Sequence, residues 1–303
     1  MKIKTIILIG IFPITLLLSC SKNKTEEERT SIKDSLETPM VETTPSISET
    51  FFQVPSPGEM LSFLHSVGKK DKNKINFLNP PAQLNKYTDN KSKALNFGIY
   101  STDLSYCSIF NMGAESIKYF KVVKQLSDQL GLSSAIQTDV LTRIEKNIDK
   151  PDSLSLIADE VYYNSFETLD ESKQGPTLAL VVAGGWIESI YIAINMVDKF
   201  QANSPIVQRI ADQKYTLENL IEFLKKHEPS SDDVKQVRAD MDELMKSFNL
   251  LKEEKISDNS IKQKEKKNLI IGGVRLVIDE KIFNEIKNKV LTIRNNYTQT
   301  LSK

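Results

Sequence analysis

The chain has 303 residues, of which 40% are hydrophobic and 26% are charged, with 40 basic against 40 acidic side chains. These proportions are those of an ordinary globular protein, and they exclude wholesale disorder and a protein with many membrane spans. Only 11 glycines and 11 prolines are present, which excludes collagen-like and linker-dominated architectures.

The first segment with a clear signature is the start of the chain. Two lysines precede an uncharged run over residues 5–19, which ends in Leu17-Leu18-Ser19-Cys20. As a helix this run would rise about 22 Å, which is short of the roughly 30 Å hydrocarbon core of a bilayer. A basic start and a short apolar run are typical of a signal peptide removed on export, here residues 1–19. An uncleaved N-terminal anchor helix is the alternative.

Leu17-Leu18-Ser19-Cys20 resembles the lipobox of bacterial lipoprotein precursors at all four positions. The resemblance covers these first twenty residues. It implies transfer of diacylglyceryl to the Cys20 thiol, cleavage after Ser19, and acylation of the new amino group with a fatty acid such as palmitate. Two or three acyl chains on one residue are expected to anchor the protein to a lipid bilayer essentially permanently. By resemblance to envelope sorting patterns, Ser21 favours the outer membrane over the inner membrane.

Residues 21–53 are predicted to form a flexible tether. This stretch holds eleven Ser or Thr, seven acidic and four basic residues, and few apolar ones. Such a composition cannot bury enough surface to offset the entropy lost on ordering. A helix over 26–37 is the alternative. The lipidated cysteine and tether (20–53) thus precede a body, 54–303, that carries 34 basic and 33 acidic residues. Such a balanced charge provides no strong field for nucleic acid.

The body is predicted to be a mostly α, multi-helix bundle of eight or nine helices. Its first helix begins at a capping box, Ser56-Pro57-Gly58-Glu59, and ends before Gly68. Glycines and prolines separate the later helices, which apolar spacing places at about 91–111, 113–130, 134–149, 153–172, 176–201, 205–227, 231–256 and 280–301. Two short apolar runs around Gly272-Gly273, at 268–271 and 274–278, predict one β-hairpin.

Short matches suggest that the body contains two duplicated three-helix units, 102–172 and 175–256. The clearest match is Glu-Ser-Ile, which occurs at residues 115–117 and again at 188–190. A run of unrelated helices is the alternative. If the duplication is real, Glu115 and Glu188 occupy equivalent positions.

Residues 177–197 form the most informative segment, because they are largely apolar and carry a single charge, Glu188. The length suits a transmembrane helix, but a carboxylate at mid-span is costly in lipid. The preferred interpretation is the central helix of the bundle. A buried Glu188 needs a partner, and Arg275 and Arg294 are the arginines predicted for that role. The pair is either structural or part of a ligand pocket.

The candidate ligand pocket combines Glu188 with Trp186, Tyr191 and Glu115, and Asp103 is a further candidate. Motifs for phosphate loops, hydrolase nucleophiles and zinc sites do not occur in the sequence, so no cofactor, metal ligand or catalytic residue is predicted. The layout of the body also resembles that of uncharacterised helical envelope lipoproteins, which implies no particular activity.

Three functions follow as expectations. The preferred one is a non-catalytic envelope lipoprotein that binds a protein or peptide partner, and it predicts an exposed apolar patch of several hundred Å² on the body. The second is a small-ligand-binding bundle with an enclosed pocket at Glu188 or Glu115. The third is an enzyme that uses carboxylates with strongly shifted pKa values in a cleft.

Overall fold

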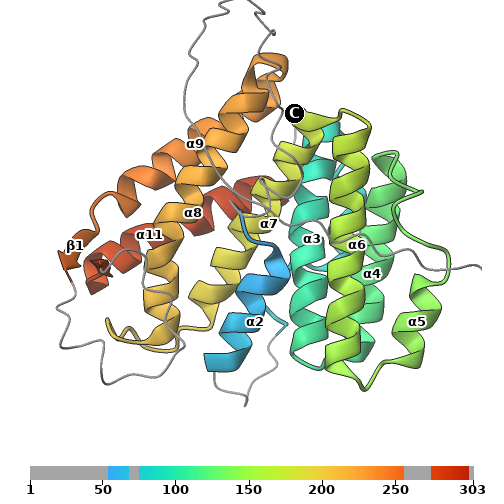
Figure 1. Ribbon diagram of the computed structural model, residues 1–303, viewed down its shortest axis with the longest axis horizontal. Coiled ribbons are helices and arrows are strands. Elements are labelled where there is room, and N and C mark those ends of the chain that lie inside the picture. Colours follow the sequence, from blue (N-terminus) through green and yellow to red (C-terminus); the bar gives the residue numbers. More distant parts are fainter. Residues whose placement is uncertain (1–53, 68–74, 256–273, 300–303) are drawn as a thin grey trace, which may run out of the picture. The chain divides into compact units, whose positions relative to one another are not determined.

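The computed structural model describes residues 54–67, 75–255 and 274–299. Within these ranges the chain forms nine α-helices, two 3-10 helices and one pair of strands, which confirms the mostly α bundle (Figure 1). The predicted signal peptide, the lipobox-like sequence and the predicted tether lie outside the described residues. The α-helices are α2 (Pro57–Val67), α3 (Asn90–Ile109), α4 (Gly113–Gln129), α5 (Val140–Lys146), α6 (Pro151–Glu171), α7 (Gly175–Asn195), α8 (Pro205–His227), α9 (Asp232–Phe248) and α11 (Glu280–Thr298).

Several helix ends follow directly from local sequence. In the predicted capping box, Ser56 Oγ accepts from the Glu59 N–H and the Glu59 carboxylate accepts from the Ser56 N–H, each at 3.3 Å. The end of α4 is a Schellman motif, in which the Leu132 N–H donates to the Ser127 carbonyl at 2.8 Å. Gly131 supplies the positive φ of 77° that this motif requires. These ends explain why the helix boundaries read from the sequence are close at α2 and α4.

Helix α7 forms the centre of the bundle. It contacts α3, α6 and α2 on one side and α8, α9 and α11 on the other (Figure 1), and its residues from Thr177 to Ile194 are all buried. Among the described helices, α7 is the one long and apolar enough to cross a bilayer, but its apolar window is 100% buried inside the protein. The central-helix interpretation therefore accounts for its composition.

Glycines allow α3 and α7 to cross with their backbones in contact. A Cβ on Gly98 would lie 2.1 Å from the Val181 carbonyl oxygen, and one on Gly184 would lie 2.1 Å from the Leu95 carbonyl oxygen. Thr102 Oγ1 spans the crossing and donates to the Gly185 carbonyl at 3.2 Å. The crossing brings Asp103 on α3 into the same buried region as Glu188 on α7.

Three helices are clearly shorter than predicted, and one predicted helical segment forms a strand instead. Helix α7 ends at Asn195 instead of continuing to 201. The predicted helix 134–149 is reduced to α5, because Ser, Thr and Asp side chains near its start favour turns over helix. Helix α9 ends at Phe248 instead of continuing to 256. Residues Lys252–Lys255 form strand β1 instead, paired antiparallel with strand β2 (Val274–Val277). This tertiary pairing overrides the helical propensity of the Lys-Glu-Glu-Lys sequence.

The hairpin prediction is confirmed at its second strand, and within the described residues this strand pairs with a segment that was not predicted to be a strand. Strand β2 lies within the predicted run 274–278, and Leu276 on it is buried. The strand paired with it is β1, in a register that places Glu253 opposite Leu276. The predicted partner, 268–271, lies outside the described residues.

The suggested duplication is not supported by where its matched residues lie. Glu115 is in the first turn of α4, whereas Glu188 lies in the middle of α7. The proposed first unit, 102–172, also begins inside α3. Glu115 and Glu188 are therefore not equivalent positions.

Candidate functional site

The centre of the site is an ion pair between the central helix and the last described helix. Arg294 on α11 donates from Nε and Nη2 to the two carboxylate oxygens of Glu188, at 2.9 and 3.0 Å. The Glu188 side chain is completely buried and that of Arg294 is 8% exposed. The Arg294 guanidinium also lies over the Tyr191 ring, 4.5 Å from its centroid. Arg294 is thus the partner that the sequence predicted.

Arg275, the other predicted partner, lies elsewhere. Its Nε donates to Gln208 Oε1 at 3.1 Å, and its Nη2 donates to Asn203. It therefore fixes strand β2 against α8 and the loop before it, and it plays no part in the ion pair.

Asp103 is the second buried carboxyl of the site. Its side chain is fully enclosed, and its Oδ2 accepts from the Asn79 backbone N–H at 3.1 Å. Burial raises the pKa of Asp103 well above its usual range, and the Glu188 charge raises it further, while Arg294 acts in the opposite direction. The core of the bundle thus encloses two acidic side chains and one basic one.

A set of amide and hydroxyl groups extends this site from the helices to the segment before α3. Asn79 Nδ2 donates to the Tyr87 hydroxyl at 3.0 Å and to Asn96 Oδ1 at 3.2 Å. Asn96 Nδ2 in turn donates to the Tyr297 carbonyl on α11 at 2.8 Å, and the Tyr87 hydroxyl donates to the Thr298 carbonyl at 3.3 Å. This network holds residues 79–87 and the end of α11 together against α3.

Asn79, Asn96 and Tyr87, which form this network, were not predicted as site residues from the sequence. Asn96 carries a usable signal, because it is a polar residue inside the apolar run around Leu95 and Phe97 on a predicted helix. Asn79 carries none, since an asparagine before two prolines is an ordinary loop residue. Its burial depends on contacts with α3 that are distant in sequence.

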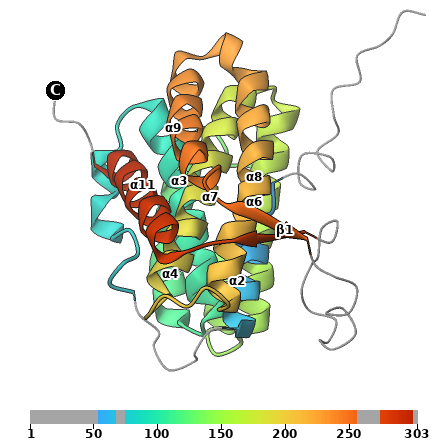
Figure 2. The same cartoon turned by 90° about the vertical axis from the view of Figure 1, so that its left-hand side faces the viewer.

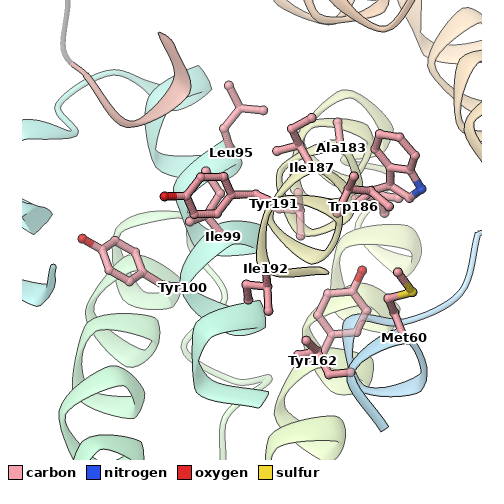
Figure 3. Packing of buried hydrophobic residues seen from close by; sticks show 14 of the residues in the cluster. Met60, Leu95, Ile99, Tyr100, Tyr162, Ala183, Trp186, Ile187, Tyr191 and Ile192 are labelled. Carbon is pink, nitrogen blue, oxygen red and sulfur yellow. The ribbon is translucent and has the colours of Figure 1, made fainter. Parts of the chain in front are cut away.

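The structure separates the predicted pocket residues into different places. Tyr191 lies beside the Glu188–Arg294 pair, as expected, and Asp103, the separate further candidate, lies in the same buried region. In Figure 3, Trp186 points away from the side of α7 that Tyr191 occupies, and its Nε1 donates to Thr216 Oγ1 on α8 at 3.2 Å. Glu115 is partly exposed and pairs with Lys118 at 2.8 Å. The predicted grouping of Glu188 with Trp186 and Glu115 is therefore wrong.

A hollow of about 370 Å³ in the described part of the chain lies at another position. It is formed where α2, the end of α3 and the start of α6 meet, and its lining residues include Ser62, His65, Phe110 and Asp152. None of its lining residues belongs to the Glu188 cluster. In the described ranges there is also no group of three His, Cys, Asp or Glu side chains placed to hold a metal ion.

A further carboxyl with a shifted pKa lies where α6 meets the start of α2. Asp159 Oδ1 would be 2.1 Å from a Cβ on Gly58, so this carboxyl lies directly against the α2 backbone. Burial, together with the charge of nearby Glu59, raises the pKa of Asp159 to about 6. The folded protein therefore binds this proton more tightly than the unfolded chain. The resulting stability is complete below the unfolded pKa of about 4 and is lost as the pH rises through about 6.

We expect Asp159→Asn to raise the free energy of unfolding by about 1–2 kcal/mol at about pH 8 and to change it little at about pH 4. Urea unfolding at the two pH values measures this difference. Glu167→Gln, an exposed carboxylate on the same helix, is the matched control and is expected to have little effect at either pH. An equal effect of Asp159→Asn at both pH values would contradict the assignment.

Comparisons of the chain with family models, with curated proteins and with solved structures found no match. The arrangement fixes α7 to α11 through the charge-assisted bonds between Arg294 and Glu188, and α3 to α11 through the bond from Asn96 to the Tyr297 carbonyl, all in a buried interior. The cluster is enclosed, and both oxygens of its central carboxylate are already occupied.

Proposed function

We propose that this protein is a lipid-anchored lipoprotein of the bacterial envelope whose helical body binds a protein or peptide partner without catalysing a reaction. Acylated Cys20 anchors it, preferably in the outer membrane, and residues 21–53 carry the body away from the bilayer. A tether of this length has a root-mean-square reach of about 30 Å. The resemblance of Leu17-Leu18-Ser19-Cys20 to a lipobox supports the anchor.

The observation that carries the proposal for the body is the closed pairing of Glu188 with Arg294. The ligand-binding and enzyme alternatives depend most on Glu188. Both of its carboxylate oxygens are bonded to Arg294 inside the core. A carboxylate without exposure and without a free oxygen is a poor ligand contact and a poor general base. This favours a structural role for the cluster and leaves the surface of the body for recognition.

The surface described by the structure favours a partner bound largely through polar contacts. The exposed large apolar side chains in the described ranges come from five separate segments, namely Val67, Ile75, Leu156, Leu250 and Val277. They do not by themselves supply the predicted apolar patch of several hundred Å². Interfaces of non-obligate complexes are about as polar as the rest of a protein surface, so a partner of this kind remains compatible with the body.

Replacing Cys20 tests the anchor. We expect Cys20→Ala to move the protein from the membrane fraction to the soluble fraction of the envelope, because the variant cannot receive an acyl chain. The chain offers a matched control in its other cysteine, Cys107, which is buried in the body. Cys107→Ala is expected to stay in the membrane fraction. Unchanged processing and retention of Cys20→Ala would contradict the proposal.

Crosslinking in intact cells tests the binding role. The wild-type protein is expected to give a discrete adduct that is lost or strongly reduced in Cys20→Ala, because anchoring sets the local concentration of the two partners. Separation of the inner and outer membranes on a density gradient then checks the predicted location. A protein that gives no adduct in either form would contradict the binding role without affecting the anchor.

A further inference from the structure

The charges enclosed by the bundle do not balance if every acid is ionised. Glu188 and Asp103 are two carboxyls, and Arg294 is one guanidinium. The side-chain hydrogen bonds of Arg294, from Nε and Nη2, both go to Glu188 and not to Asp103. A net negative charge in a dry core is costly, because burial penalises the charged form of an unpaired group.

The groups that face Asp103 from the surrounding elements supply no second positive charge. They are Glu188 and Tyr191 on α7, Arg294 on α11, Tyr87 before α3, Tyr100 and Cys107 on α3, and Tyr119 on α4. Burial raises the pKa of each of these tyrosines and of Cys107, so all five side chains are neutral at pH 7. Arg294 is the one cation among them.

The hydrogen bonds of Asp103 indicate how the cluster becomes electrically neutral. Its Oδ2 accepts from the Asn79 N–H, whereas its Oδ1 is buried and has no donor among the described residues. The Glu188 carboxylate also acts on the Asp103 carboxyl across the α3–α7 crossing. Two ionised carboxylates have no proton with which to bond to each other, whereas a neutral carboxyl can donate one.

We propose that Asp103 carries a proton at neutral pH and donates it from Oδ1 to the Glu188 carboxylate, so that the three side chains form a neutral, buried proton-binding site. The proton joins α3 to α7, as Arg294 joins α7 to α11. Its loss would leave one uncompensated charge where three helices and residues 79–87 meet. The site thus makes the junction of these elements sensitive to alkaline pH.

This proposal predicts proton release on unfolding. In the unfolded chain an aspartate has a pKa of about 4, so the folded state holds one extra proton over the pH range between that value and its own higher pKa. Folding stability from this group is therefore complete below about pH 4 and falls as the pH rises. The unfolding equilibrium constant should increase about tenfold per pH unit from this site alone.

The variant Asp103→Asn is the test, since the amide is the same size, is neutral at every pH and can donate to Glu188. Unfolding of the full chain in urea can be followed through Trp186, the single tryptophan. We expect the ratio of the unfolding constants, wild type over variant, to rise about tenfold per pH unit between about pH 5 and pH 7. Equal pH dependence of the two proteins would overturn the proposal.

A bound monovalent cation beside the two carboxylates would balance the charge equally well. In that case the stability of the wild type would rise with sodium or potassium concentration at constant ionic strength, and this result would also overturn the proposal.

Infrared spectra of the wild type test the proposal even if Asp103→Asn does not fold. At about pH 8, where Asp159 with its pKa of about 6 is ionised, the wild type should still show the carbonyl band of a protonated carboxyl. Absence of the band would contradict the proposal.

Discussion

Replacing Arg294 by methionine is expected to lower the free energy of unfolding of the body by about 3–5 kcal/mol. The variant keeps much of the apolar stem of the side chain but removes both donors to Glu188. Glu188 is then left in a completely buried position beside Asp103, with no opposite charge. Denaturant unfolding followed through Trp186 measures the loss, and near neutral pH it should appear as a large shift of the transition midpoint.

A double variant separates the cost of an unpaired charge from the contribution of the pair. In Glu188→Leu combined with Arg294→Met, both charges are gone and the core is apolar at these positions. Replacing a whole buried pair by apolar residues is often neutral or even stabilising, so we expect more than half of the loss to be recovered. A loss of less than about 1 kcal/mol in the single variant Arg294→Met would contradict a buried, bidentate pair.

Replacing Gly184 by alanine is expected to destabilise the body by about 2–4 kcal/mol. The new methyl group would lie 2.1 Å from the Leu95 carbonyl oxygen. This oxygen belongs to the α3 backbone, so it can move away only if the helix itself moves. The two central helices would have to separate, which disturbs the contact between Asp103 and Glu188. The loss exceeds the roughly 1 kcal/mol that alanine gains over glycine in a helix.

The next residue provides the matched control. A Cβ on Gly185 would meet its nearest neighbours, Pro57 Cγ and Thr102 Oγ1, at 3.4 and 3.5 Å, which is ordinary contact. Gly185→Ala is therefore expected to be neutral or stabilising by up to about 1 kcal/mol. Thermal unfolding of the two variants under identical conditions compares them. Similar behaviour of both would show that α3 and α7 do not cross at Gly184.

Most of the helices could be predicted from the sequence because their signals are local. The capping box at Ser56 and Glu59 and the glycine at the end of α4 act within a few residues, so their consequences are readable without a fold. Lys252–Lys255 shows the opposite case. Its residues favour helix, and it forms a strand because β2, more than twenty positions later, pairs with it.

The candidate site was predictable in its charges but not in its geometry. Glu188 is the one charged residue in a long apolar segment, so its burial requires a positively charged partner. Because the body contains few arginines, the candidates were few, and Arg294 was among them. The short sequence matches gave a wrong prediction, because they placed Glu115 with Glu188, whereas Glu115 pairs with Lys118. Asn79 could not be found at all, because a loop residue gives no sign that it will be buried.

The most direct measurement of the central claim is the mass of the N-terminal peptide of the protein extracted from its native envelope with detergent. We expect a peptide that begins at Cys20 and carries the added mass of a diacylglyceryl group and a further acyl chain. A peptide that runs unmodified from Ser19 through Cys20 would contradict this expectation, since both the anchor and the cleavage would then be absent.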